Sequence, residues 1–172
     1  MSKYIVDFQG FSESRSFIIK ELTIINLFGE NVTHFLVKPP FEKTILSDQE
    51  QRSVSWLENY HHKIKWEDGV LEYVEVFENF RKTIRDADVI YVKGHEKAMF
   101  IREVTGKFTI DLDELDCPRV ANLPIPKLWN TITCSHHSTS NGICSMLQAM
   151  KFKAFVLNLF ERGIDEVDIT FK

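Results

Sequence analysis

The sequence predicts one α/β domain built on a mixed β-sheet and spanning residues 1–172. Three observations predict this class. The N-terminal part holds β-branched, apolar runs separated by short turn segments, as in an antiparallel meander. The rest alternates between helical and strand patterns, as in parallel strand–helix units. A chain of 172 residues with 44% hydrophobic residues is also long enough and apolar enough to bury one sizeable core.

Three predicted strands form the meander, over residues 3–8, 16–27 and 31–38. The second is a long β-branched run that we expect to be buried on both faces. Turn-forming residues separate the first strand from the second, and a turn containing glycine separates the second from the third. Two consecutive prolines, Pro39 and Pro40, end the third strand.

Helical and strand patterns alternate after the prolines. Ser47 and Glu50 match a capping box for a helix that runs to about Tyr60. Apolar residues at helical spacing predict a second helix over 69–87. We then expect a strand over 88–93, a helix over 95–104, a strand over 107–112 and a long helix over 140–162 capped by Ser140 or Asn141. This order, three antiparallel strands leading into strand–helix units of one sheet flanked by helices, is that of an RNase H-like fold.

Composition excludes some classes of function. The formal charge of -4 and the pI of about 5.9 argue against a broad basic surface for duplex binding, but they allow a local basic groove. No apolar run is long enough to span a membrane, and the N-terminal segment is typical of a strand rather than a signal peptide. An odd count of three cysteines is a poor disulfide framework. We therefore expect a reducing compartment, the cytoplasm or the nucleus or both.

A nuclease of this fold needs several carboxylates to hold two divalent metal ions. The stretch VDFQGF, with Asp7, resembles the first motif of the DEDDh 3′–5′ exonucleases, but Gln9 replaces the second acid of that motif. Lys97 and the next three residues stand where the following motif needs Asp, and Cys144 stands where the last motif needs it. Of the four expected carboxylates only Asp7 remains, so the sequence predicts a pseudo-exonuclease that has lost the DEDD set. The alternative for Asp7 itself is a polar residue at the end of the strand.

Cysteine and histidine cluster in the stretch TCSHHSTSNGICSML. Cys134, His137 and Cys144 have the spacing of three ligands of a tetrahedral metal site, and the start of a helix would favour a thiolate at Cys144. The fourth ligand is either Cys117 or Glu21, which is a costly carboxylate in a buried strand unless it is paired or metal-bound. The alternatives are unrelated buried cysteines with loop histidines, Glu21 paired with Lys or Arg, or Cys144 as a nucleophile with His137 as its base.

The stretch CSHHSTSNGICSML is similar to the signature of the Maelstrom domain of animal piRNA-pathway proteins. That resemblance implies an RNase H-like fold related to DEDDh exonucleases, with a Glu-Cys-His-Cys site that holds a structural Zn²⁺. The ligands would be Glu21, Cys134, His137 and Cys144, with His136 a neighbour that does not ligate. The chain departs from Maelstrom by lacking the HMG box that precedes this domain.

The resemblance implies binding of RNA, with single strands as the expected form, in small-RNA silencing of the piRNA type. Silencing-pathway proteins are the expected partners. Phosphate contacts need only well-placed cations, and single-stranded bases stack on aromatic rings. The candidate phosphate contacts are Lys93, His95, Lys97 and Arg102. The candidate stacking residues are Phe8, Phe11, Tyr60 and Trp66.

Two other functions stay open. The first is a single-strand-specific endoribonuclease that does not use the DEDD site, with Asp7, His95 and Lys97 as candidate catalytic residues. His61 or His62 could then serve as the general base, because imidazole titrates near neutral pH. The second is a protein-interaction scaffold without an RNA function, which the acidic pI favours.

Overall fold

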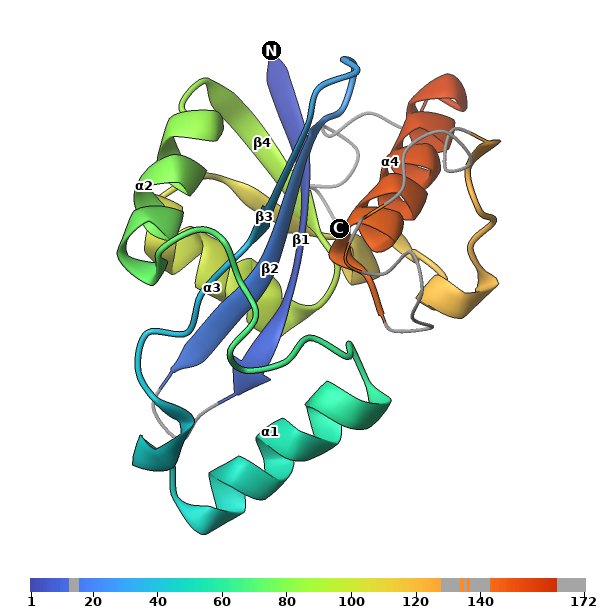
Figure 1. The fold of residues 1–172 in the computed structure, drawn as a ribbon. Coiled ribbons are helices and arrows are strands. Elements are labelled where there is room, and N and C mark those ends of the chain that lie inside the picture. The colour runs from blue at the N-terminus through green and yellow to red at the C-terminus, as the bar shows by residue number, and fades with distance from the viewer. Residues whose placement is uncertain (13–15, 128–133, 135, 137–142, 164–172) are drawn as a thin grey trace.

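The computed structural model describes the chain apart from residues 13–15, 128–133, 135, 137–142 and 164–172 (Figure 1). It contains a five-stranded mixed sheet in the order β3-β2-β1-β4-β5, so the predicted fold class is confirmed. The first three strands are antiparallel, and β4 and β5 continue the sheet in parallel with β1. The strands are β1 (Ser2–Ser12), β2 (Phe17–Asn26), β3 (Val32–Leu36), β4 (Ala87–Val92) and β5 (Thr109–Asp111).

Helices cover both faces of the sheet (Figure 1). Two of them, α2 and α3, lie on one face, α4 lies on the other, and α1 lies beyond the end of the β1–β2 hairpin. No helix in the described part of the chain is long and apolar enough to cross a membrane. The helices are α1 (Asp48–Tyr60), α2 (Tyr73–Thr83), α3 (His95–Thr105) and α4 (Ser145–Glu161), with short 3₁₀ turns at Lys43–Ile45, Leu112–Leu115 and Val120–Asn122.

The two central strands are buried on both faces, as the long β-branched run in β2 predicts. Successive side chains alternate between the faces. Val6 and Ile24 pack with α2 and α3, whereas Ile5 and Ile25 pack with α4. Polar side chains that share the parity of Ile5 and Ile25 therefore face α4, and these are Asp7, Gln9, Glu21 and Thr23.

A register shift interrupts this alternation. Gln9 pairs with Glu21, but Gly10 pairs with Ile19, so Lys20 is the extra residue of a β-bulge. A Cβ atom at position 10 would lie 1.9 Å from the carbonyl oxygen of Ile18, so only glycine fits there. The bulge turns Ile19 toward the core beneath α2 and α3, so Ile19 and Glu21 lie on opposite faces of the sheet.

Two helices begin later than expected. The helix predicted over 69–87 begins at Tyr73, because the segment before it is extended. Just after β3, Val37 forms a β-bridge with Leu71, and the carbonyl of Leu71 accepts from the N–H of Lys38. The predicted caps of the last helix lie outside the described residues. That helix begins at Ser145 with Cys144 as its N-cap residue, and the N–H of Ile143 donates instead to the carbonyl of His61.

Candidate metal centre and nucleic-acid face

Glu21 is a fully buried carboxylate in the middle of β2, on the face that α4 covers. Its Oε2 accepts a hydrogen bond of 2.9 Å from the backbone N–H of Ser145, the first residue of α4. A carboxylate here satisfies an N–H that the helix itself leaves without an acceptor, and it lies at the favourable end of the helix dipole. One oxygen of Glu21 therefore caps α4, while Oε1 faces the thiols.

Two cysteine thiols converge on that oxygen. Cys134 Sγ lies 3.7 Å and Cys144 Sγ lies 3.8 Å from Glu21 Oε1. Both cysteines are buried, and the three donor atoms lie within 4.8 Å of one another. Thiolates and carboxylates are ligands that divalent transition metals accept. Three of the predicted ligands thus form a cluster that could hold a metal ion, which we call the Glu-Cys-Cys cluster.

The Glu-Cys-Cys cluster concentrates acidic groups away from water. A hydrogen bond with Cys134, burial and the charge of Glu21 raise the pKa of Cys144 far above its ordinary value of 9.0. We expected the helix start to favour a thiolate at Cys144, but these neighbours outweigh the helix dipole. A divalent cation would reverse the balance, because it stabilises thiolates and carboxylate together.

The other ligand candidates from the sequence do not join this cluster in the described part of the chain. His137 lies outside the described residues. His136 Nε2 lies 3.6 Å from Asp68 Oδ2. Cys117 lies in another loop, where its carbonyl oxygen accepts from Lys93. Of the two candidates for the fourth ligand, Glu21 is the one that meets the thiols.

His34 is a residue of this site that the sequence analysis missed. It lies on β3, directly across from Thr23. Its Nε2 lies 3.5 Å from Cys134 Sγ and 3.4 Å from Glu21 Oε1. The short turn after Asn26 could have indicated His34. It fixes the β2–β3 register and so brings His34 beside the two inward polar residues of β2, Glu21 and Thr23.

Asp7 lies one strand away, on the same face of the sheet, and is fully buried. Lys97 Nζ, from the first turn of α3, donates to Asp7 Oδ1 at 2.6 Å and to the carbonyl of Phe8 at 2.7 Å. The other oxygen of Asp7 accepts from Gln9 Nε2, which also donates to Gln148 Oε1. Burial raises the pKa of Asp7, and the nearby ammonium of Lys97 works against that rise.

Among the described residues, the side chains bonded to Asp7 are the ammonium of Lys97 and the amide of Gln9. We expected Cys144 at the place of the last metal-binding Asp. The α4 side chain that reaches this site is instead Gln148, one turn farther along, which accepts from Gln9 Nε2. Cys144 points to Glu21 instead. A pair of divalent cations needs several anionic oxygen ligands. The hydrogen bonds of Asp7 to described side chains bring it a cation and an amide.

Comparisons with known proteins support the topology. A solved structure described as exonuclease X in complex with 5′ overhanging duplex DNA is similar over 97% of this chain and 96% of that chain, with a TM-score of 0.53 and 15% sequence identity. The chain has an exonuclease-like fold. No protein-family model matches the chain, and no curated protein matches it.

Three of the four predicted phosphate contacts are engaged within the molecule. Lys93 pairs with Asp113, Lys97 with Asp7, and Arg102 donates to the carbonyl of Thr109. His95 begins α3 and is exposed. His95 is therefore the best placed of the four to meet a ligand from solvent.

The histidine pair after α1 divides into one buried and one half-buried ring. His62 is fully buried, with Nε2 3.2 Å from the carbonyl of Gly10 and Nδ1 accepting from the N–H of Ile64, so it is not placed to act on a substrate. His61 is half-buried and stacks on Trp56 with ring centroids 5.9 Å apart. Burial, and then the charge of Lys97, lower the pKa of His61.

Three of the four predicted stacking residues are wrong, because Phe8, Phe11 and Trp66 are core residues with 1% exposure. Tyr60 is 74% exposed, and Trp56, one helical turn before it, is 55% exposed. Arg52 is exposed one further turn back. Residues four apart lie on one side of a helix, so Arg52, Trp56 and Tyr60 form a basic and aromatic stripe, which we call the α1 stripe.

A cavity of about 530 Å³ lies on the other side of Lys97, between α3 and the end of the β1–β2 hairpin. Phe17 and Phe100 line it, with ring centroids 6.0 Å apart, and His95 and Lys97 lie at its polar side. Its size suits one planar group, and its lining combines aromatic rings with Lys97, His95 and the carboxylates of Glu96 and Glu103. We call it the α3 cavity.

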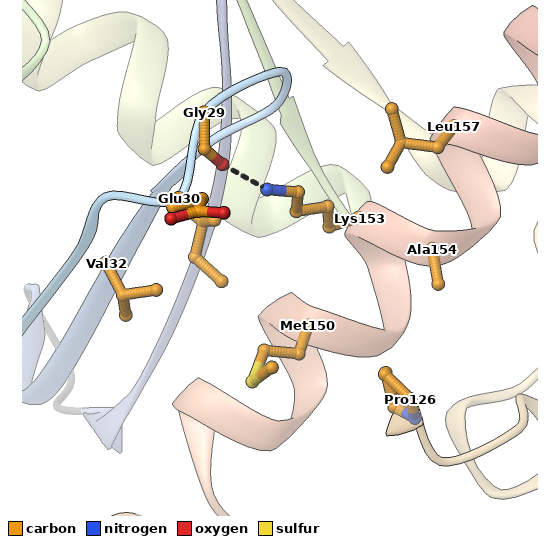
Figure 2. Close-up of a pocket in the computed structure, with 9 residues that line it drawn as sticks. Gly29, Glu30, Val32, Pro126, Met150, Lys153, Ala154 and Leu157 are labelled. Carbon is orange, nitrogen blue, oxygen red and sulfur yellow. Dashed lines mark hydrogen bonds between the residues drawn. The ribbon is translucent and has the colours of Figure 1, made fainter. Parts of the chain in front are cut away.

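A second cavity, of about 360 Å³, lies between the β2–β3 turn and α4 (Figure 2). Met150, Ala154 and Leu157 give it an apolar lining from α4. The ammonium of Lys153 already donates to the carbonyls of Asn26 and Gly29. This cavity therefore has little polar chemistry with which to select a ligand.

Proposed function

We propose that the protein is a pseudo-exonuclease that binds single-stranded RNA without cleaving it by two-metal chemistry. The observation that carries this proposal is the ion pair between Lys97 and the buried Asp7. It lies in an exonuclease-like fold, at the position where the sequence pattern expects the first metal-binding carboxylate. The similar solved structure holds DNA, which supports nucleic acid as the class of ligand.

The ammonium of Lys97 compensates the negative charge of Asp7, as a bound metal ion would in a two-metal exonuclease. It neutralises Asp7 from a tethered side chain, at a hydrogen-bond distance of 2.6 Å. The second position of the first motif holds the neutral amide of Gln9, which also bonds to Asp7. A divalent cation entering here would meet the fixed positive charge of Lys97 beside Asp7, which disfavours binding of two such ions.

Single strands are the form of RNA that suits the exposed surface. Unpaired bases stack on aromatic rings, which the α1 stripe supplies through Trp56 and Tyr60. The α3 cavity offers a further aromatic site, with His95 exposed beside it. A net charge of -4 disfavours duplex binding, which depends on many phosphate contacts.

The resemblance to the Maelstrom domain supports two finer parts of the proposal. The Glu-Cys-Cys cluster holds a structural Zn²⁺ that joins α4 to β2. The protein acts in small-RNA silencing of the piRNA type, with partners from that pathway, in the cytoplasm or the nucleus or both. Zinc suits a buried cluster of thiols and carboxylate better than the hard, oxygen-seeking Mg²⁺ does.

RNA binding is tested by fluorescence anisotropy with a labelled single-stranded RNA, with Trp56→Ala as the decisive variant. We expect its Kd to rise about 5- to 150-fold, because stacking on one aromatic ring contributes about 1–3 kcal/mol per base. The matched control is Phe108→Ala, which removes an aromatic side chain of similar exposure, 54%, outside the α1 stripe and both cavities. Its Kd should stay at the wild-type value.

Two results would contradict the proposal. Wild-type protein that binds no RNA at any salt concentration would leave a protein-interaction scaffold as the better reading. The second result is that wild-type protein cleaves the RNA and that His61→Ala or His95→Ala, with its fold retained, no longer does. That result would favour the endoribonuclease instead.

A further inference from the structure

We infer that the α3 cavity binds a guanine base of single-stranded RNA, with Glu96 and Glu103 as the residues that select guanine. This inference rests on the proposed RNA binding and names the base that the protein prefers. The α3 cavity lies on the face of the sheet that packs with α2 and α3, opposite the Glu-Cys-Cys cluster.

Three aromatic rings form one wall of the α3 cavity. The ring centroid of Phe8 lies 5.3 Å from that of Phe17 and 5.4 Å from that of Phe100. Phe8 is buried, whereas Phe17 and Phe100 are half-buried, so these two rings leave part of their surface open. Because the three rings pack on one another, the wall is formed before a ligand arrives, and it offers a base an aromatic surface for stacking.

Two carboxylates flank Phe100 along α3. Glu96 precedes Phe100 by four residues and Glu103 follows it by three, spacings that put the three side chains on one side of the helix. Both glutamates line the α3 cavity and both are exposed. An ionised carboxylate offers two acceptor oxygens and no donor. A base stacked on Phe100 therefore has a hydrogen-bond acceptor one helical turn away in either direction.

The charges of the lining favour a base over a phosphate group. The ammonium of Lys97 already donates to Asp7 Oδ1 and to the carbonyl of Phe8. Glu96 and Glu103 repel an anion, whereas a neutral base meets no such repulsion. We therefore expect the strand to insert a base into the α3 cavity and to keep its phosphates outside.

Guanine is the base whose edge matches a carboxylate. Its Watson–Crick edge places two donors side by side, the N1–H and the N2 amino group, and these can donate to both oxygens of one carboxylate. Adenine and cytosine place one amino donor beside a ring nitrogen that accepts, and uracil has one N–H between two carbonyls. Proteins read single-stranded RNA through this edge, so an acceptor-only side chain beside a stacking ring selects guanine.

Fluorescence anisotropy with short labelled RNAs tests the preference. One RNA contains only uridine apart from a central guanosine, and matched RNAs carry at that position adenosine or inosine, which lacks the N2 amino group. We expect the guanosine RNA to bind about 5- to 150-fold tighter than the adenosine RNA, as for other bidentate contacts to a base, with the inosine RNA between them. Equal Kd values for the guanosine and adenosine RNAs would overturn the inference.

Glu96→Gln combined with Glu103→Gln tests the role of the two carboxylates. Both side chains are exposed and glutamine has the same size, so the fold should be retained. The ratio of the Kd values for the guanosine and adenosine RNAs is the readout, because loss of two negative charges strengthens binding of any RNA. We expect this ratio to fall to about one. The matched control Glu161→Gln, at an exposed position of α4, should keep the wild-type ratio, and a wild-type ratio in the double variant would overturn the inference.

Two further measurements separate the possible failures. Trp56→Ala should weaken binding of both RNAs by the same factor, because the α1 stripe does not select a base. Free guanosine should compete only far above the Kd of the guanosine RNA, and competition at that Kd would assign the cavity to a free nucleoside instead. Wild-type protein that binds none of the RNAs would refute the proposed function, whereas binding without a base preference would refute this inference alone.

Discussion

Lys97 and Asp7 form an ion pair at 2.6 Å, with Asp7 fully buried and Lys97 about one quarter exposed. The sequence indicates that Lys97 lies in the region where an exonuclease motif needs an acid. It does not reveal that the substituted side chain turns back to the remaining acid. That contact depends on where α3 begins relative to β1, which is a property of the tertiary structure.

We predict that Lys97→Met lowers the free energy of unfolding by about 2–3 kcal/mol, because it leaves the carboxylate of Asp7 buried without its cation. Asp7→Asn combined with Lys97→Met should recover most of that loss, since both charges are then removed. Urea unfolding of the two single variants and the double variant measures the coupling. Lys82→Met, at an exposed position of α2, is the control and should change stability by less than about 0.5 kcal/mol. Additive effects in the double variant would show that the two side chains do not interact.

Elements of regular structure were largely predictable, because hydrophobic periodicity and turn residues identify them locally. The capping box at Ser47 is confirmed, with Glu50 N donating to Ser47 Oγ and the side chain of Glu50 accepting from Ser47 N. The bulge at Lys20 was not predictable, since an extra residue in a strand leaves no clear period-2 signal. The start of α4 was also missed, because its cap comes from Glu21 on a distant strand.

Glu21 has two separable roles, as cap of α4 and as metal ligand. With zinc removed by a chelator, we predict that Glu21→Gln is more stable than Glu21→Ala by about 1–2 kcal/mol, because the amide oxygen still accepts from Ser145 N. Without the chelator, both variants should lose bound zinc. Urea unfolding and metal analysis measure the two effects. Equal stability of the two variants without zinc would show that the cap contributes nothing.

The whole molecule places two polar sites on one face of the sheet. The Glu-Cys-Cys cluster joins β2 to α4, and the Asp7–Lys97 pair joins β1 to α3. The spacing of the cysteines predicted Cys134 and Cys144, and a family resemblance favoured Glu21 over Cys117. The structure brings Glu21, Cys134 and Cys144 together. The sequence did not predict His34, because that residue reaches the site through strand pairing rather than through a motif.

The central claim is that this exonuclease-like protein binds RNA but does not use two-metal catalysis. The most direct measurement follows a single-stranded RNA labelled at its 5′ end, with and without Mg²⁺, by native and denaturing electrophoresis of the same samples. We predict a shifted complex whose RNA stays full-length and whose Kd does not depend on Mg²⁺. Mg²⁺-dependent shortening of the RNA from its 3′ end, abolished by Asp7→Asn, would contradict the claim.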